Sequence, residues 1–274
     1  MKNWHKDIAQ WRVGNTLYLS VVFTWQLKEA DEIAMQHNGK TLIGGPAVKL
    51  MYGDDTKIPY DILSFHNPLA TFTTRGCPNK CSFCAVPIIE GEFRELQEWK
   101  PNPVICDNNL LACSKQHFER VINSLMQFPY ADFNQGLDAR LLTDWHVEQL
   151  SRLKHVHLRF AFDHISSETV VHDAIKRTQS RGMKDIGVYV LIGYSDTPED
   201  ALYRLEKVRE WGIRPNPMRY QPLNTETKNS YIHPMWSEEE LRKMMKYYSR
   251  LRWLEHIPYD EYSFKRDKQG ILKL

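Results

Sequence analysis

Three of the five cysteines of this 274-residue chain lie close together in the stretch TTRGCPNKCSFCAVP. Cys77, Cys81 and Cys84 have the spacing C-x3-C-x2-C. Zinc ribbons and fingers usually supply their ligands as two separated pairs, and Cys106 and Cys113 do not form a second pair of that kind. Iron–sulfur cubanes are also held by cysteine thiolates. The spacing therefore predicts a [4Fe-4S] cluster with one iron open to an outside ligand; a zinc knuckle or a chance cluster is the alternative.

The bulk composition is that of an ordinary globular protein. The formal net charge is +2, with 26% charged and 42% hydrophobic residues. The sequence contains no run of about 18 apolar residues, so no membrane span is predicted. The first residues, MKNWHKDIAQW, lack the apolar core of a signal peptide. An odd, clustered set of cysteines does not resemble a disulfide framework. We therefore expect a reducing cytoplasm, where clustered thiols usually bind metal or do redox chemistry.

The elements that must position the cysteines repeat along the chain. Apolar β-type runs begin at residues 70, 103, 131, 157, 187 and 217 and alternate with amphipathic helical runs. Helix N-caps are predicted at Ser114, Thr143 and Thr197, and Ser237 with Glu240 has the capping-box spacing. The alternation predicts an α/β fold with a parallel sheet, which six units can curl into a partial (β/α)6 TIM-like barrel. The cysteine loop follows the first strand and so lies at the carboxyl ends of the strands, where chemistry is expected.

We predict three regions. Residues 1–69 are interpreted as a truncated Rossmann-like βαβ extension with a linker, residues 70–235 as the partial barrel, and residues 236–274 as a C-terminal helix with a basic tail. The basic face of that helix could contact nucleic acid, although a solvated face is the more common explanation.

The cysteine loop and the barrel behind it resemble the radical S-adenosylmethionine (SAM) superfamily, over roughly residues 70–235. Arg75-Gly76-Cys77-Pro78 and Phe83 also match the residues that such loops commonly carry. The resemblance implies that the three cysteines hold the cluster and that the SAM amine and carboxylate chelate the open iron. It also implies a reductant protein such as flavodoxin or ferredoxin, and a 5′-deoxyadenosyl radical that abstracts a hydrogen atom from the substrate.

Further site residues come from strand alternation and from the resemblance. Alternation turns Arg159, Ala161 and Asp163 of one strand, and Tyr189, Leu191 and Gly193 of the next, toward the lumen. The same logic turns Ile105 and Asp107 inward and Cys106 outward. Tyr189 and Arg219 are the candidate catalytic residues that face the substrate. The candidate cofactor-binding residues are Phe83, Asp107, Asn108, Asn109, Gln135, Asp163, Arg177 and Gly193.

The resemblance gives some of these residues a specific role, and plainer explanations compete with it. Asp107-Asn108-Asn109 stands where relatives often carry Gly-Gly-Glu, and Asp107 is a candidate for the SAM amine; a loop-capping turn is the alternative. Arg177 is a candidate for the SAM carboxylate, or else a solvated cation at a helix end. Asp163 suits a ribose diol, and Gly193 suits a close approach to adenine.

The N-terminal stretches YLSVVFTWQLKEA and TLIGGPAV resemble part of the cobalamin-binding domain that precedes some radical SAM barrels. The Asp-x-His-x-x-Gly motif of that family is absent, so we interpret the region as a truncated remnant and disfavour cobalamin binding.

The leading functional hypothesis is a radical SAM enzyme, possibly one that modifies a nucleotide or nucleic acid; peptides and small metabolites are the alternative substrates. A second class is an iron–sulfur electron-transfer protein, or a zinc-binding structural protein, that does not use SAM. Cys106 and Cys113 are expected to be core residues, since free cysteine is among the most buried residue types.

Overall fold

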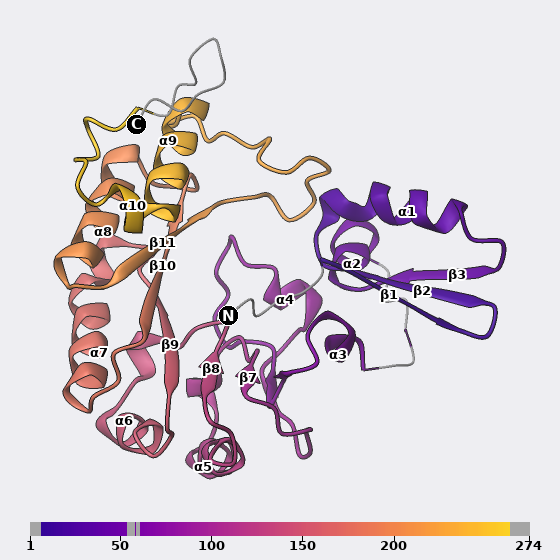
Figure 1. The fold of residues 1–274 in the computed structure, drawn as a ribbon, viewed down its shortest axis with the longest axis horizontal. Helices are drawn as coiled ribbons and strands as arrows, with labels where there is room; N and C mark the ends of the chain where they lie inside the picture. Colours follow the sequence, from indigo (N-terminus) through magenta and orange to yellow (C-terminus); the bar gives the residue numbers. More distant parts are fainter. Residues whose placement is uncertain (1–6, 54–57, 59–60, 264–274) are drawn as a thin grey trace.

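The structure is a computed structural model that describes residues 7–53, 58 and 61–263. It contains a small N-terminal unit with a three-stranded sheet and a larger α/β unit with a six-stranded sheet (Figure 1). None of the helices in these ranges is long and apolar enough to cross a bilayer.

The N-terminal unit has a βαβ arrangement preceded by one more strand. β2 (Thr16–Val21) and β3 (Lys40–Gly44) are parallel and are joined through α1 (Leu27–Met35), as the sequence predicted. β1 (Ile8–Val13) was not predicted and pairs with β2 as an antiparallel hairpin. α2 (Pro46–Tyr52) begins after Gly45, whose φ of 98° is accessible mainly to glycine.

The larger unit is built on six parallel strands in sequential order. The strands are β4 (Ala70–Thr71), β7 (Val104–Ile105), β8 (Ala131–Phe133), β9 (Val156–Ala161), β10 (Ile186–Ile192) and β11 (Arg214–Arg219). Each of the six predicted β runs overlaps one strand, and the predicted parallel sheet is confirmed. The sheet is open, with β4 and β11 at its edges. This architecture is compatible with a partial barrel.

β11 begins at Arg214, three residues before the predicted run, and contains two prolines, Pro215 and Pro217. Tyr220 N–H donates to Ile192 O of β10, so the backbone N–H groups of the even-numbered residues of β11 point toward β10. Pro215 and Pro217 fall on the opposite parity and face the free edge of the sheet. A proline there removes no ladder hydrogen bond and protects the edge from further strand pairing.

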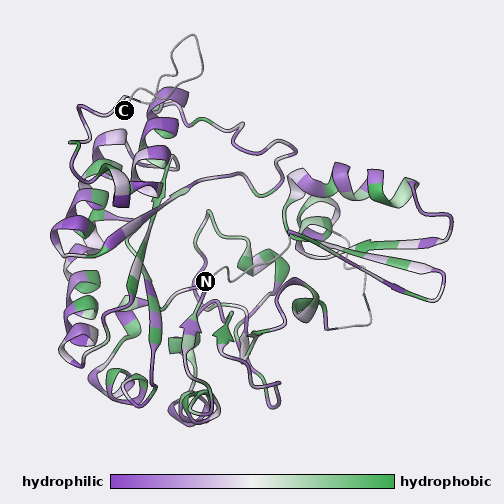
Figure 2. Ribbon diagram, viewed as in Figure 1, coloured by the Kyte–Doolittle hydropathy of each residue, from purple (hydrophilic) through white to green (hydrophobic). Residues whose placement is uncertain are grey.

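Helices cover the outer face of this sheet and connect the strands (Figure 1). They are α5 (Lys115–Leu125), α6 (Asp144–Leu150), α7 (Glu168–Ser180), α8 (Pro198–Glu210), α9 (Glu238–Ser249) and α10 (Leu251–Leu254). The predicted N-caps are confirmed, because the side chains of Ser114, Thr143, Thr197 and Ser237 each accept the N–H three residues on. Figure 2 shows hydrophobic residues concentrated on the strands, with mixed polarity along the helices.

The side-chain directions predicted for β9 and β10 agree with the structure, whereas those predicted for β7 were wrong. Leu158, Phe160 and Phe162 are fully buried in the main core. Ile105 also packs in that core, and Cys106 packs with Val104 in a separate small cluster. β7 has only two residues in the ladder, and they are equally apolar, so alternation carried no signal there.

The N-terminal unit contacts the larger unit through α2, which lies against α4 (Val86–Ile89), and through two sets of side-chain contacts. The Ser20 hydroxyl lies 2.9 Å from His66 Nε2 in a buried contact with α3 (Ile62–His66). Thr24 Oγ1 donates to Thr225 O, and Lys228 Nζ lies 5.8 Å from the Trp25 ring centroid. The segment 220–236, between β11 and α9, therefore reaches from the sheet to the N-terminal unit (Figure 1).

Candidate functional site

The three clustered cysteines lie on the long connection between β4 and β7, at the carboxyl end of β4. This connection contains a small antiparallel pair, β5 (Thr74–Arg75) with β6 (Arg94–Glu95), and the short helix α4 (Val86–Ile89). Cys81 is exposed, while Cys77 and Cys84 are half-buried, and all five cysteines of the chain are free thiols. The Cys84 N–H donates to Cys81 O at 3.0 Å, which forms a turn between these two ligand candidates.

The start of this loop is fixed by Gly76 and Glu90. Gly76 has φ of 74°, and a Cβ built on it would lie 2.3 Å from Glu92 O, so another residue there would displace the loop. Its N–H donates to Glu90 Oε2 at 2.8 Å, and the same carboxylate pairs with Arg75 at 3.2 Å. The conformation just before Cys77 is therefore determined by backbone contacts that only glycine allows.

The three cysteines are donors of the type that holds an iron–sulfur cubane. Burial raises the pKa of the Cys81 and Cys84 thiols, and the neighbouring cysteines raise both values further by charge repulsion. The three sulfurs are therefore near enough to repel one another as thiolates, and a cationic iron group would relieve that repulsion. Within the described ranges, no group of three or more His, Cys, Asp or Glu side chains is arranged around one metal ion. Thiolates that each bind a different iron need not converge on one point.

A carboxylate that sequence reasoning missed connects the cysteine loop to the loops after β7 and β8. Asp138 Oδ2 accepts from Asn79 Nδ2 at 3.1 Å and from Asn109 Nδ2 at 3.3 Å. Arg140 donates to both Asp138 oxygens, at 2.8 and 2.7 Å. Asn109 Nδ2 also lies 3.7 Å from Cys77 Sγ. The position of Asp138 in the loop after the third strand is the feature of the sequence that could have identified it as a site residue.

Asp107 holds the base of the cysteine loop. Its carboxylate is 2% exposed and accepts the N–H groups of Thr73 and Thr74, at 2.6 and 3.0 Å, and the Thr73 hydroxyl. Burial raises the pKa of Asp107 to about 6, against the lowering effect of these hydrogen bonds. Both carboxylate oxygens are thus engaged by the chain itself, which is the arrangement expected for the loop-capping alternative.

The two asparagines after Asp107 carry buried polar atoms that lack partners. Asn108 Nδ2 and Asn109 Oδ1 make no hydrogen bond to any part of the chain that the structure describes. Asn109 is 2% exposed and lies against Cys77. Buried polar atoms are normally hydrogen-bonded, so these two are available to a bound group.

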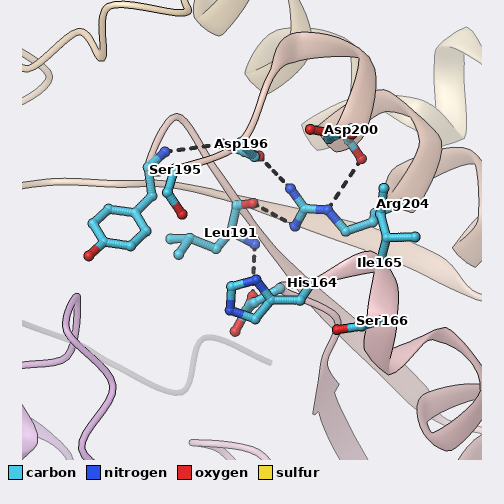
Figure 3. Close-up of a pocket in the computed structure, with 10 residues that line it drawn as sticks. His164, Ile165, Ser166, Leu191, Ser195, Asp196, Asp200 and Arg204 are labelled. Atoms are coloured by element: carbon cyan, nitrogen blue, oxygen red, sulfur yellow. Dashed lines mark hydrogen bonds and ion pairs between the residues drawn. The ribbon is translucent and has the colours of Figure 1, made fainter.

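A pocket of about 270 Å³ lies at the carboxyl ends of β9 and β10 (Figure 3). On one wall Asp163 Oδ1 accepts the Leu191 N–H at 3.0 Å, and burial raises the pKa of this carboxyl. The lining residues are Asp163, His164, Ile165, Ser166, Leu191, Tyr194, Ser195, Asp196, Asp200 and Arg204. Asp163, which the sequence predicted to point toward the lumen, lines this pocket.

The second wall of the pocket is fixed by Arg204 of α8, which sequence reasoning missed. Its guanidinium is almost completely buried and pairs with Asp196. It also donates to Leu191 O at 2.9 Å, at the end of β10 (Figure 3), and to Phe162 O at 3.1 Å, just after β9. Asp196 in turn accepts the N–H of Gly193 at 3.1 Å. The pair therefore sets the loop after β10 in a single conformation.

Tyr194 connects the pocket to the cysteine loop. It lines the pocket, its hydroxyl donates to Ser82 Oγ at 2.7 Å, and its ring meets Phe83 edge-on with centroids 5.5 Å apart. The predicted residues Phe83 and Asp163 are thus brought to one region of the molecule, beside Cys81 and Cys84.

The adjacent Gly193 has φ of 77°, and a Cβ there would lie 2.8 Å from Leu241 Cδ2. The position is therefore closely packed against α9.

Three further site residues predicted from the sequence do not line the pocket. Tyr189 is half-buried, with its hydroxyl 3.4 Å from Asn134 O, and Gln135 is exposed. Arg177 donates to Leu142 O and pairs with Asp144 in the helical layer.

Arg219 is engaged in tying the 220–236 segment to α9. It donates to Asn229 O and Tyr231 O and pairs with Glu238 at 2.9 Å. Neither Arg177 nor Arg219 lines the pocket.

No family model matches this chain. A stretch of 126 residues is 32% identical to the ribosomal protein uS12 methylthiotransferase RimO of Treponema denticola. That stretch is 46% of this chain and 24% of the relative, so the match spans about a quarter of the length of that curated protein.

Two solved structures are similar in part. One is coproporphyrinogen III oxidase (HemN) from Escherichia coli, described as a radical SAM enzyme, with a TM-score of 0.39, 11% identity, and coverage of 54% of this chain and 40% of that one. The other is Streptococcus suis SuiB bound to the precursor peptide SuiA, with a TM-score of 0.48, 12% identity, and coverage of 85% and 60%. Both TM-scores are too low to establish a shared fold.

Proposed function

We propose that this chain is a radical SAM enzyme whose Cys77, Cys81 and Cys84 hold a [4Fe-4S] cluster. The observation that carries the proposal is the position of three free thiols on one loop at the carboxyl end of the first strand, beside the pocket that Tyr194 joins to that loop. The sequence similarity to RimO supports the same superfamily. When bound, the cluster and SAM supply the electron and the adenosyl group from which a 5′-deoxyadenosyl radical forms.

The chain's own residues would bind and orient the SAM molecule. The Asp163 carboxylate can accept hydrogen bonds from a ribose diol, and Tyr194 offers an aromatic wall between the pocket and the cysteines. The Nδ2 end of Asn109 faces Cys77, and its buried Oδ1, which has no partner in the described part of the chain, is an acceptor that suits an ammonium group. In this proposal Asn109 takes the amine contact that the sequence suggested for Asp107, because Asp107 is already saturated by Thr73 and Thr74.

The substrate would approach from the lumen side of the strands. Arg159 pairs with Asp132 there, and Tyr189 lies opposite Ala161 in the β9–β10 ladder. We propose a nucleotide or nucleic-acid substrate, because the C-terminal helix carries a basic face. A peptide or a small metabolite is the alternative, and the name of RimO, a ribosomal protein methylthiotransferase, favours the peptide. A second cluster is not part of the proposal, because Cys106 is fully buried and Cys113 is half-buried against the core.

Anaerobic reconstitution tests the proposed function. The full chain, loaded with iron and sulfide and reduced with dithionite, is expected to convert SAM into 5′-deoxyadenosine and methionine, measured by chromatography. Cys81→Ala should abolish both products. Cys113→Ala is the matched control, since it removes a thiol outside the cluster loop, and should retain cluster and SAM cleavage.

Two outcomes would overturn this function. The first is protein that purifies with stoichiometric zinc and takes up no iron–sulfur cluster, which is the result expected of a structural zinc protein. The second is cluster-loaded protein that cleaves no SAM, which is the result expected of an electron-transfer protein.

A further inference from the structure

Three loops converge on a single carboxylate behind the cysteine cluster. Asp138, after β8, accepts from Asn79 of the cysteine loop and from Asn109 of the loop after β7. Its side chain is 12% exposed, whereas that of its partner Arg140 is 60% exposed. The hydrogen bonds of Asp138 therefore fix two amide side chains and one guanidinium at the carboxyl ends of the strands.

One of these amides is aimed at a candidate ligand. Asn109 Nδ2 lies 3.7 Å from Cys77 Sγ and 3.3 Å from Asp138 Oδ2. Asn109 is 2% exposed, so water does not compete strongly for this N–H group. Asp138 holds the amide nitrogen on the side of the sulfur and thereby determines which end of the asparagine faces Cys77.

The guanidinium adds a charge to the same place. The hydrogen bond to Asp138 raises the pKa of the Arg140 guanidinium, and the charges of Cys81 and Cys77 raise it further. The bidentate contact, at 2.8 and 2.7 Å, holds the guanidinium beside Asp138, although the Arg140 side chain is 60% exposed. The positive charge of Arg140 also offsets the negative charge that Asp138 would otherwise present to the cysteines.

We propose that Asn109, Asp138 and Arg140 are positioning residues that raise the reduction potential of the cluster held by Cys77, Cys81 and Cys84. The inference rests on the proposed function. Reduction adds one electron, and so one negative charge, to the cluster and its thiolates. An N–H donor on a thiolate sulfur and a nearby cation both stabilise the reduced form more than the oxidised form, and such groups set the potentials of these clusters.

The test is a redox titration of the cluster without SAM, followed by electron paramagnetic resonance of the reduced form. Asn109→Leu removes the N–H donor while keeping the branched shape of the side chain, and Arg140→Gln removes the cation. Each is expected to lower the reduced-to-oxidised ratio about tenfold at the wild-type midpoint, a negative shift of about 59 mV for a one-electron couple.

The matched control for charge is Arg152→Gln. Arg152 is also hydrogen-bonded to side-chain oxygens, of Gln149 and Asn123, but follows the end of α6 away from the cysteine loop. Its midpoint should equal that of the wild type. Because Arg140 is exposed, its substitution is expected to leave folding and cluster uptake intact. Its midpoint potential can therefore be measured even where Asn109→Leu does not take up the cluster.

The outcomes separate this inference from the function on which it rests. A wild-type chain that binds no cluster overturns both. A wild-type chain that binds the cluster, with Arg140→Gln unshifted or shifted only as far as Arg152→Gln, overturns the inference and leaves the proposed function standing. An unchanged midpoint in cluster-loaded Asn109→Leu has the same meaning.

Discussion

At the scale of single residues, Asp107 illustrates how burial redirects a side chain from a ligand role to a structural one. Its sequence position, at the end of a strand next to the cysteine loop, is compatible with both roles. The structure gives all of its close contacts to Thr73 and Thr74. A carboxylate with saturated hydrogen bonds and 2% exposure keeps the loop base in place, at the cost of burying a charge.

This burial predicts a pH-dependent stability. The folded pKa of Asp107, about 6, lies above the ordinary value of 3.8, so the folded state binds this proton more tightly than the unfolded state. The contribution of Asp107 to stability is therefore greatest below about pH 4 and falls as the pH rises through about 6. The loss is at most about 3 kcal/mol, at about 1.4 kcal/mol per pKa unit.

Asp107→Asn provides the comparison, because its amide keeps an acceptor for Thr73 and Thr74 and does not titrate. Urea unfolding of the apo-protein at pH 4.5 and at pH 7.5 should show the wild type losing stability relative to the variant at the higher pH. A difference between the two proteins that stays constant over this range would contradict the assignment.

At the scale of elements, the pocket depends on how α8 begins. Thr197 and Asp200 form a capping box, and Arg204, one turn further, binds the carbonyls that end β9 and β10. The capped start of α8 and the pocket wall formed by Arg204 therefore belong to the same short segment of the helix. Local sequence signals predicted the cap, and the cap sets the direction in which Arg204 projects.

Thr197→Ala is expected to lower the free energy of unfolding by about 1 kcal/mol, because the cap hydrogen bond to Asp200 N–H is lost. Ser167→Ala is the matched control, since Ser167 is the N-cap residue of α7 but makes no capping hydrogen bond, and its hydroxyl donates only to His164 O in an exposed contact. Denaturant unfolding of both variants measures the difference. Equal destabilisation by the two substitutions would count against the role given to the cap.

At the scale of the whole molecule, the N-terminal unit is docked on the larger unit and holds the 220–236 segment. Ser20 of β2 contacts His66 of α3 in a buried pair. Thr24 and Trp25 contact Thr225 and Lys228. We therefore interpret the N-terminal unit as a support for the segment that follows β11.

Thr24→Val removes the hydrogen bond to Thr225 O and should loosen that segment. Loss of about 1 kcal/mol would raise the open population about fivefold, so chymotryptic cleavage after Tyr231 should accelerate about fivefold. Thr41→Val is the matched control in the same unit, because Thr41 Oγ1 has no partner within the part of the chain the structure describes. Cleavage at the same rate in both variants and the wild type would refute the contact's role.

The sequence by itself determined the features that depend on local pattern. The strand–helix rhythm gave the order and direction of the six strands, because each βα unit is encoded within about thirty residues. The capping residues determined where four helices begin, since a cap needs only a hydroxyl and an N–H three positions on. The cysteine spacing placed three thiols on one loop.

Only the tertiary structure decided which distant side chains meet. Asp138 and Asn109 come together behind Cys77 because parallel strands end at one edge, yet nothing in their spacing signals the contact. Arg204 of α8 meets the carbonyls of Phe162 and Leu191 because the parallel strands β9 and β10 end beside that helix. Ile105 was assigned to the wrong face, since two apolar residues in a row carry no alternation. Periodicity predicts an element and its face, whereas hydrogen bonds between loops depend on the path of the whole chain.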